Sequence, residues 1–195
     1  MMTHSRKFIL SAVLSSAIVL GLSGCAAALV GATAVGISAA TDTRSVGTQL
    51  DDQTIEIRTI TALKGESRLE NSRIKVTSFN RSILLLGQVS DSSMRDLATH
   101  LVRNVEGVQR VHNELQVAPV ISFGQISKDT YITSKVKAKF VTDETVKAAE
   151  IKVVTENAEV ALMGIVTREV ADHAIEITRN TNDVKRVIDA FEIRR

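Results

Sequence analysis

The sequence predicts an α+β fold with two tandem small domains, each with a three-stranded sheet packed by two helices. Three observations predict it. First, the chain repeats itself, because RIKVTSFNRSILLLGQV at 73–89 aligns with EIKVVTENAEVALMGIV at 150–166. Second, apolar residues recur at helical spacing outside these segments, and third, strand-like apolar runs lie within them. Each copy therefore has the order α-β-β-α-β, which gives two layers per domain.

The N-terminus has the pattern of a secretory signal. Arg6 and Lys7 form a short basic region, and the apolar stretch from 8 to 22 is short for a membrane-spanning helix. The sequence LSGC then resembles the bacterial lipobox, in which the signal is cut before a cysteine that accepts a diacylglyceryl group. We therefore interpret 1–24 as a lipoprotein signal peptide, Cys25 as the lipid anchor and 25–46 as a lipidated membrane-proximal tether.

Two other interpretations of Cys25 stay open, namely a lone free or buried thiol and a cleaved signal without lipid. A disulfide within the chain is excluded, because there is no second cysteine. The next residue is Ala26. By resemblance to the sorting rules of such lipoproteins, the absence of Asp at this position favours the outer membrane.

Helix spacing predicts the two helices of each domain. Ile132, Val136 and Phe140 lie four residues apart and form one apolar stripe, which predicts the first helix of the second copy. In the first copy, apolar residues at helical spacing over 94–105 predict the second helix, which Gly107 ends.

Asn80-Arg81 and Asn157-Ala158 interrupt the apolar strands with a polar break and predict two tight hairpin turns. Gly87 and Gly164 follow in the second strand of each hairpin. We expect close backbone packing at both glycines, in preference to a ligand-binding loop.

The closing strands are predicted from alternating apolar residues at 108–117 and 184–193. Asp183 stands in the second copy where the first has Gly107, which affects only the local turn. The resulting organisation is a first domain, a linker with the only proline and a second domain, at 47–117, 118–125 and 126–195.

No residue pattern points to catalysis. His100, His112 and His173 have no second histidine or cysteine at ligand spacing, and no catalytic triad, phosphate-binding loop or cofactor fingerprint is visible. The sequence therefore predicts a non-enzymatic protein without a metal or cofactor. A formal net charge of +2 gives no sign of nucleic-acid binding.

One helix carries a basic stripe. Lys128, Tyr131, Lys135 and Lys139 fall within an arc of about 80° on the first helix of the second copy. The aligned positions of the first copy hold a different set, Asp51, Thr54, Arg58 and Ala62. Such a stripe suits an anionic membrane surface. The alternative is an ordinary solvated helix face.

The strands ILLLGQV and VALMGIV, with their central glycines, and the segments GVQRV and DVKRV resemble BON domains. Two such units behind a lipobox, with ATDTRSVGTQLDD and DTYITSKVKAKF, resemble the dual-BON-domain outer-membrane lipoproteins of the DolP type. The resemblance implies a periplasm-facing outer-membrane protein that supports membrane integrity and is enriched at the division site. The alternative is a protein-interaction scaffold for envelope assembly machinery.

In that family the first helix of the second BON domain binds anionic phospholipid, notably phosphatidylglycerol. Carried onto this chain together with the basic stripe, the predicted phospholipid-binding residues are Lys128, Asp129, Tyr131, Ile132, Lys135, Val136, Lys137, Lys139 and Val141. Ile132 and Val136 are also candidates for the hydrophobic core.

Overall fold

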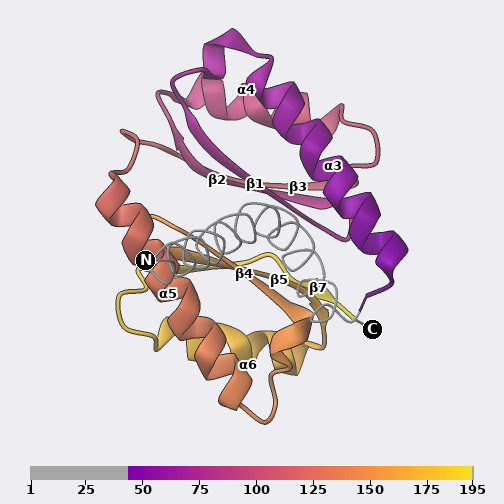
Figure 1. Cartoon of the computed structure of the whole chain (residues 1–195), viewed down its shortest axis with the longest axis vertical. Coiled ribbons are helices and arrows are strands. Elements are labelled where there is room, and N and C mark those ends of the chain that lie inside the picture. Colours follow the sequence, from indigo (N-terminus) through magenta and orange to yellow (C-terminus); the bar gives the residue numbers. More distant parts are fainter. Residues whose placement is uncertain (1–43, 195) are drawn as a thin grey trace, which may run out of the picture. The chain divides into compact units, whose positions relative to one another are not determined.

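The computed structural model describes residues 44–194. The predicted signal peptide, the predicted anchor Cys25 and the tether up to residue 43 lie outside the described residues. Residues from Arg44 onward form one compact unit, and Figure 1 shows its helices and strands.

The described residues contain two copies of one element order, as the repeat predicts. The first copy consists of α3 (Val46–Lys64), a 3-10 turn η1 (Ser67–Leu69), β1 (Arg73–Phe79), β2 (Ser82–Val89), α4 (Ser92–Arg103) and β3 (Arg110–Val117). The second consists of α5 (Phe123–Thr142), η2 (Ala148–Glu150), β4 (Ile151–Glu156), β5 (Glu159–Val166), α6 (Arg168–Arg179), β6 (Arg186–Asp189) and β7 (Glu192–Ile193). The α+β prediction is confirmed.

Each sheet is built around the second strand of its hairpin. β2 pairs antiparallel with β1 and parallel with β3, and β5 pairs antiparallel with β4 and parallel with β6 and β7. Helices α3 and α4 cover one face of the first sheet, and α5 and α6 cover one face of the second (Figure 1). A hydrophobic core lies under each helix pair.

The closing strand of the second domain differs from the prediction, because it is interrupted. β6 ends at Asp189 and β7 starts at Glu192, whereas β3 is continuous. The Asp189 carboxylate accepts the N–H of Phe191 at 3.0 Å and turns the chain between the two strands. Before β6, Asp183 adopts φ 75°, so it takes the left-handed conformation that Gly107 adopts in the first domain at φ 94°.

The second face of each sheet is also covered, because the two sheets pack on each other within the compact unit. Leu84 and Leu86 face this third core, whereas Ile83 and Leu85 face the helices. Burial on both faces explains why β2 is a continuous apolar run instead of an alternating one. Apolar residues of both sheets form the third core: Phe79, Leu84, Leu86, Val154, Ala161, Met163, Ile188 and Ala190.

Buried carboxylates fasten the first helix of each domain to its hairpin turn. Asp52 accepts the N–H groups of Asn80 and Arg81 at 2.7 and 2.8 Å. Asn80 and Arg81 have φ of 48° and 60°, as a type I′ turn requires. Burial by itself raises the pKa of Asp52, but hydrogen bonds from Arg81 N–H, the Arg44 guanidinium and Asn80 N–H outweigh it and hold the pKa below its ordinary value.

Thr59 gives a direct test of core packing in α3. Its side chain is fully buried, and within the described residues its hydroxyl has no hydrogen-bond partner. The repeat aligns it with Val136, which is equally buried. We expect Thr59→Val to raise the free energy of unfolding by about 1 kcal/mol, because an unsatisfied hydroxyl is replaced by a methyl group of similar shape. Urea unfolding measures this, and an unchanged or lower stability would contradict it.

Candidate functional site

Helix α5 starts earlier than the repeat predicts. It begins at Phe123, inside the predicted linker 118–125, because the Ser122 side chain caps it by accepting the N–H of Gln125 at 3.3 Å. Its inner side packs on the second core through the predicted apolar stripe, and Phe140 is 1% exposed. The opposite side of α5 remains exposed.

Three of the predicted phospholipid-binding residues lie on the inner side of α5. Ile132 and Val136 are 2% and 0% exposed, so they belong to the core. Asp129 is 4% exposed and accepts the N–H groups of Asn157 and Ala158, each at 2.8 Å. The structure therefore gives these three residues structural roles, in the core and at the hairpin turn.

Two lysines of the basic stripe are occupied by the protein itself. Lys135 Nζ donates to the carbonyl of Asn182 at 3.1 Å and pairs with Asp183 at 3.0 Å. Lys139 Nζ donates to the carbonyl of Asn180 at 2.9 Å. These carbonyls follow the C-terminus of α6, where cationic groups are favourable. Lys135 and Lys139 therefore hold the segment between α6 and β6 beside α5.

Lys128 and Lys137 are the freer cations of α5. Both are exposed, and neither has an ion pair or side-chain hydrogen bond in the part of the chain that the structure describes. On a helical projection they flank the outer face from opposite sides. Tyr131 lies between them, 63% exposed, with Lys135 Nζ 5.0 Å from its ring centroid.

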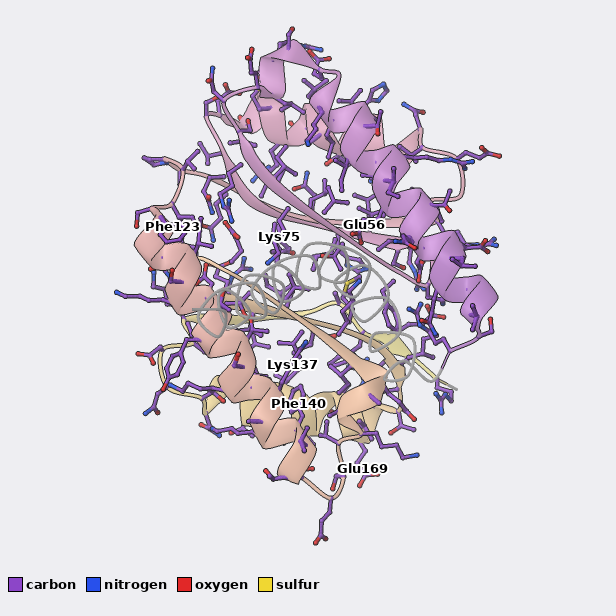
Figure 2. The ribbon with its side chains drawn as sticks, viewed as in Figure 1. Glu56, Lys75, Phe123, Lys137, Phe140 and Glu169 are labelled. Atoms are coloured by element: carbon purple, nitrogen blue, oxygen red, sulfur yellow. The ribbon has the colours of Figure 1, made fainter. Side chains whose placement is uncertain are left out.

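The outer face also carries apolar side chains. Phe123 is 81% exposed and Val141 is 73% exposed, so apolar groups stand near both ends of the helix. Figure 2 shows Phe123 at the start of α5, with Lys137 further along the same helix. Val141 is among the phospholipid-binding residues predicted from the family resemblance, whereas Phe123 is not. Ser122 followed three residues later by Gln125 is a capping-box signal that would have extended the helix to include it.

Acidic side chains are absent from the exposed face of α5 itself, because Asp129 is buried and the helix holds no other carboxylate. Asp143 ends the helix. The N–H of Val146 and the His173 ring hold the pKa of Asp143 below its ordinary value. The exposed face of α5 therefore carries cations and apolar groups, and the anionic Asp143 follows its C-terminus.

The first helix of the other domain has a different outer face. Val46, Leu50 and Ile57 are exposed on α3. Arg58 and Asp51 on this helix are paired, since Arg58 contacts Glu106 at 3.0 Å and Asp51 contacts Arg81 at 3.1 Å. Helix α3 holds no aromatic residue, so exposed aromatic rings together with unpaired cations are a property of α5 and not of its counterpart α3.

Other kinds of site find no support within residues 44–194. No cluster of three or more metal-ligating side chains occurs there. None of the described helices has the length and hydropathy needed to span a bilayer.

Known proteins resemble the chain over most of its length. The BON domain family matches residues 51–119 and 128–195. The chain is 45% identical over 172 residues to the outer membrane lipoprotein DolP of Haemophilus influenzae, covering 88% of this chain and 89% of that protein. It is 41% identical to a 21 kDa hemolysin of Actinobacillus pleuropneumoniae and 30% identical to the osmotically-inducible protein Y of Escherichia coli, which cover 75% and 73% of this chain and 76% and 72% of those proteins.

Proposed function

We propose that this chain, which belongs to the BON-domain family and is an outer membrane lipoprotein of the DolP type, docks on anionic phospholipid through the exposed face of α5. BON-domain proteins of this type are not enzymes. Their lipoprotein class implies an acyl anchor in the membrane, and Cys25 is the residue that carries it in this proposal.

The observation that carries the proposal is an exposed face of α5 that holds two aromatic rings and has a free lysine on either side of it. Phe123 and Tyr131 supply ring area that favours the membrane interface, and Lys128 and Lys137 stand free to reach lipid phosphates. Each lysine near anionic headgroups contributes about 1 kcal/mol. The acyl anchor keeps α5 at high effective concentration near the bilayer, so a weak contact is enough.

Phosphatidylglycerol is the proposed lipid, because the resemblance to the DolP-type family implies it. Its phosphodiester carries one negative charge, which the lysines of α5 can pair with. Within the cell this docking helps to maintain outer-membrane integrity. It also enriches the protein at the division site, because anionic lipid is concentrated there. The second candidate is a protein-interaction scaffold for envelope assembly machinery, which the exposed apolar side chains of α3 favour.

Vesicle co-sedimentation of the 44–195 unit, which contains all three hydrophobic cores, tests the proposal. We expect binding to phosphatidylcholine vesicles that contain phosphatidylglycerol, little binding to pure phosphatidylcholine, and weaker binding as salt rises. Lys128→Glu/Lys137→Glu should weaken binding tenfold or more, by roughly 1 kcal/mol for each lost lysine contact and further repulsion from each new carboxylate. Neither side chain has a partner within residues 44–194, so circular dichroism should show that the fold persists.

Lys64→Glu/Arg95→Glu is the matched control. It changes the net charge equally, at exposed basic residues of the first domain that have no side-chain partner among the described residues. If both double variants lose binding equally, general charge attracts the protein and α5 has no special role. If the wild-type unit ignores anionic vesicles, the scaffold function replaces lipid docking.

A further inference from the structure

The outer edge of β3 is open. In the first sheet the strand order is β1-β2-β3, so among the described residues β3 has a strand neighbour on one side only. Ala118 N–H donates to Val89 at the end of β2. Backbone groups alternate in direction along a strand, so the odd-numbered residues of β3 direct theirs away from β2. Leu115 agrees, because its N–H bonds to the Asn113 side chain instead of to β2.

The second half of this edge is shielded and the first half is not. Asn113 Oδ1 accepts the Leu115 N–H at 3.0 Å, and Thr99 and the Arg95 carbonyl hold the Asn113 amide in place. Such a side-chain cover is one way in which proteins protect sheet edges. Further back, Gln109 N–H is bonded to the Arg81 carbonyl. The N–H of Val111 lies between these two and points to the open side.

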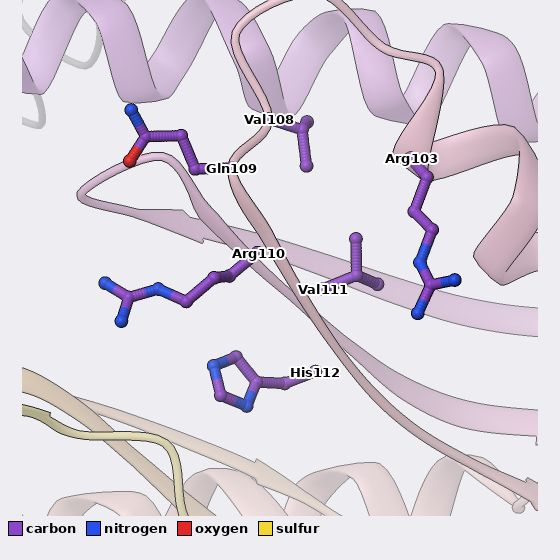
Figure 3. A pocket seen from close by; sticks show the side chains of 6 residues that line it. All are labelled: Arg103, Val108, Gln109, Arg110, Val111 and His112. Atoms are coloured by element: carbon purple, nitrogen blue, oxygen red, sulfur yellow. The ribbon is translucent and has the colours of Figure 1, made fainter.

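A hollow of about 450 Å³ lies along the unshielded half. It is lined by Arg103 and by five consecutive residues of one chain segment, Val108 to His112 (Figure 3). Val108 and Val111 are partly buried against the first core and give this edge an apolar side. A hollow that follows consecutive residues of an edge strand has the form that an extended peptide fills.

The charge beside the hollow is positive. Arg103 reaches from the last turn of α4 alongside β3 (Figure 3), and its side chain has no ion pair within residues 44–194. Arg110, on the same strand, is paired with Glu192. Arg103 is therefore the cation that remains available to a carboxylate on whatever occupies the edge.

We propose that the β3 edge between Gln109 and Asn113 binds an extended, acidic segment of a partner protein by strand addition. The Val111 N–H and the carbonyls of Gln109 and Val111 form the ladder, and Arg103 pairs with a carboxylate of the added segment. This surface belongs to the first domain and does not depend on lipid docking by α5. It would let the protein hold a protein partner while α5 is on the membrane.

Two designed peptides test the proposal on the ¹⁵N-labelled 44–195 unit. The acidic probe is ETVTVE and its matched control is KTVTVK, both capped at their ends. We expect millimolar ETVTVE to shift the amide signals of residues 109–113 and to slow hydrogen exchange at Val111, and KTVTVK to do neither. Arg103→Glu should reverse this preference. An absence of shifts, or equal shifts with both peptides, would overturn the proposal.

A proline at position 111 tests the ladder itself. Val111→Pro removes the outward N–H while leaving the bonds to β2, and proline is tolerated at an edge in that orientation. Binding of ETVTVE should disappear in Val111→Pro and persist in Val111→Thr. If Val111→Pro fails to fold, exchange at Val111 in the wild-type unit decides, since strand addition must protect that amide. Binding that persists in folded Val111→Pro would sink strand addition.

Discussion

We expect Gly87→Ala to lower the free energy of unfolding more than any other glycine-to-alanine substitution in the first domain. Gly87 has φ 130°, which side-chain-bearing residues rarely adopt. A Cβ there would also lie 1.9 Å from the carbonyl oxygen of Arg73 on β1. Since Gly87 pairs with Ile74 in the ladder, relief requires that β1 and β2 separate. We expect a loss of about 4 kcal/mol or more in the free energy of unfolding, measured by urea unfolding of the 44–195 unit.

Gly164→Ala is the internal control for this prediction. Gly164 occupies the matching position of β5, and its added Cβ would lie 2.6 Å from the Glu150 carbonyl. Its φ is outside the strained range, and Glu150 precedes β4 at the end of η2, where the backbone is freer to shift. We therefore expect a smaller loss, of about 2 kcal/mol. Equal losses in the two variants would show that contact alone, without the backbone conformation of Gly87, sets the cost.

The repeat made most of the fold predictable. Because the pattern occurs twice, each helix and strand is predicted independently in both copies. The hairpin turns and the close packing at Gly87 and Gly164 were predicted correctly in this way. The interruption between β6 and β7 was not, because it depends on one side chain, Asp189, that bonds the Phe191 N–H.

The candidate site was less predictable, because helical spacing fixes the direction of a side chain and not its partner. The stripe placed Lys135 and Lys139 toward the surface, yet each reaches carbonyls that lie more than 40 residues away in sequence. Spacing alone could not separate them from Lys128, which lies on the same stripe. The exposure of Phe123 also depends on where α5 begins, which is decided by the Ser122 cap.

Asp129 is a predicted lipid-binding residue that also stabilises the fold, so the two roles have to be tested separately. It stands among the lysines in sequence, but its carboxylate accepts the N–H of Asn157, the N–H of Ala158 and the Gln125 amide, all at 2.8 Å. Asn157 and Ala158 have φ of 52° and 63°, so this turn depends on its hydrogen bonds. The same arrangement at Asp52 in the first domain shows that it belongs to the fold.

We therefore expect Asp129→Asn to lower the free energy of unfolding by about 3 kcal/mol. The amide has one acceptor oxygen where the carboxylate has two, so a buried N–H loses its partner and a charge-assisted bond is lost. Urea unfolding measures the loss, and Asp52→Asn should cost a similar amount in the first domain. Beyond the turn, Asp52 also accepts hydrogen bonds from the Arg44 guanidinium and from Ser78 Oγ.

Vesicle binding by Asp129→Asn then distinguishes a structural role from a lipid contact. If Asp129 acts through the fold, the folded fraction of the variant binds anionic vesicles as tightly as wild type does, and removing a negative charge adds little because the group is buried. Lys128→Glu/Lys137→Glu should give the opposite result, with stability kept and binding lost. Tighter binding by stable, folded Asp129→Asn would mean that the carboxylate faces the lipid and repels it, contrary to its burial.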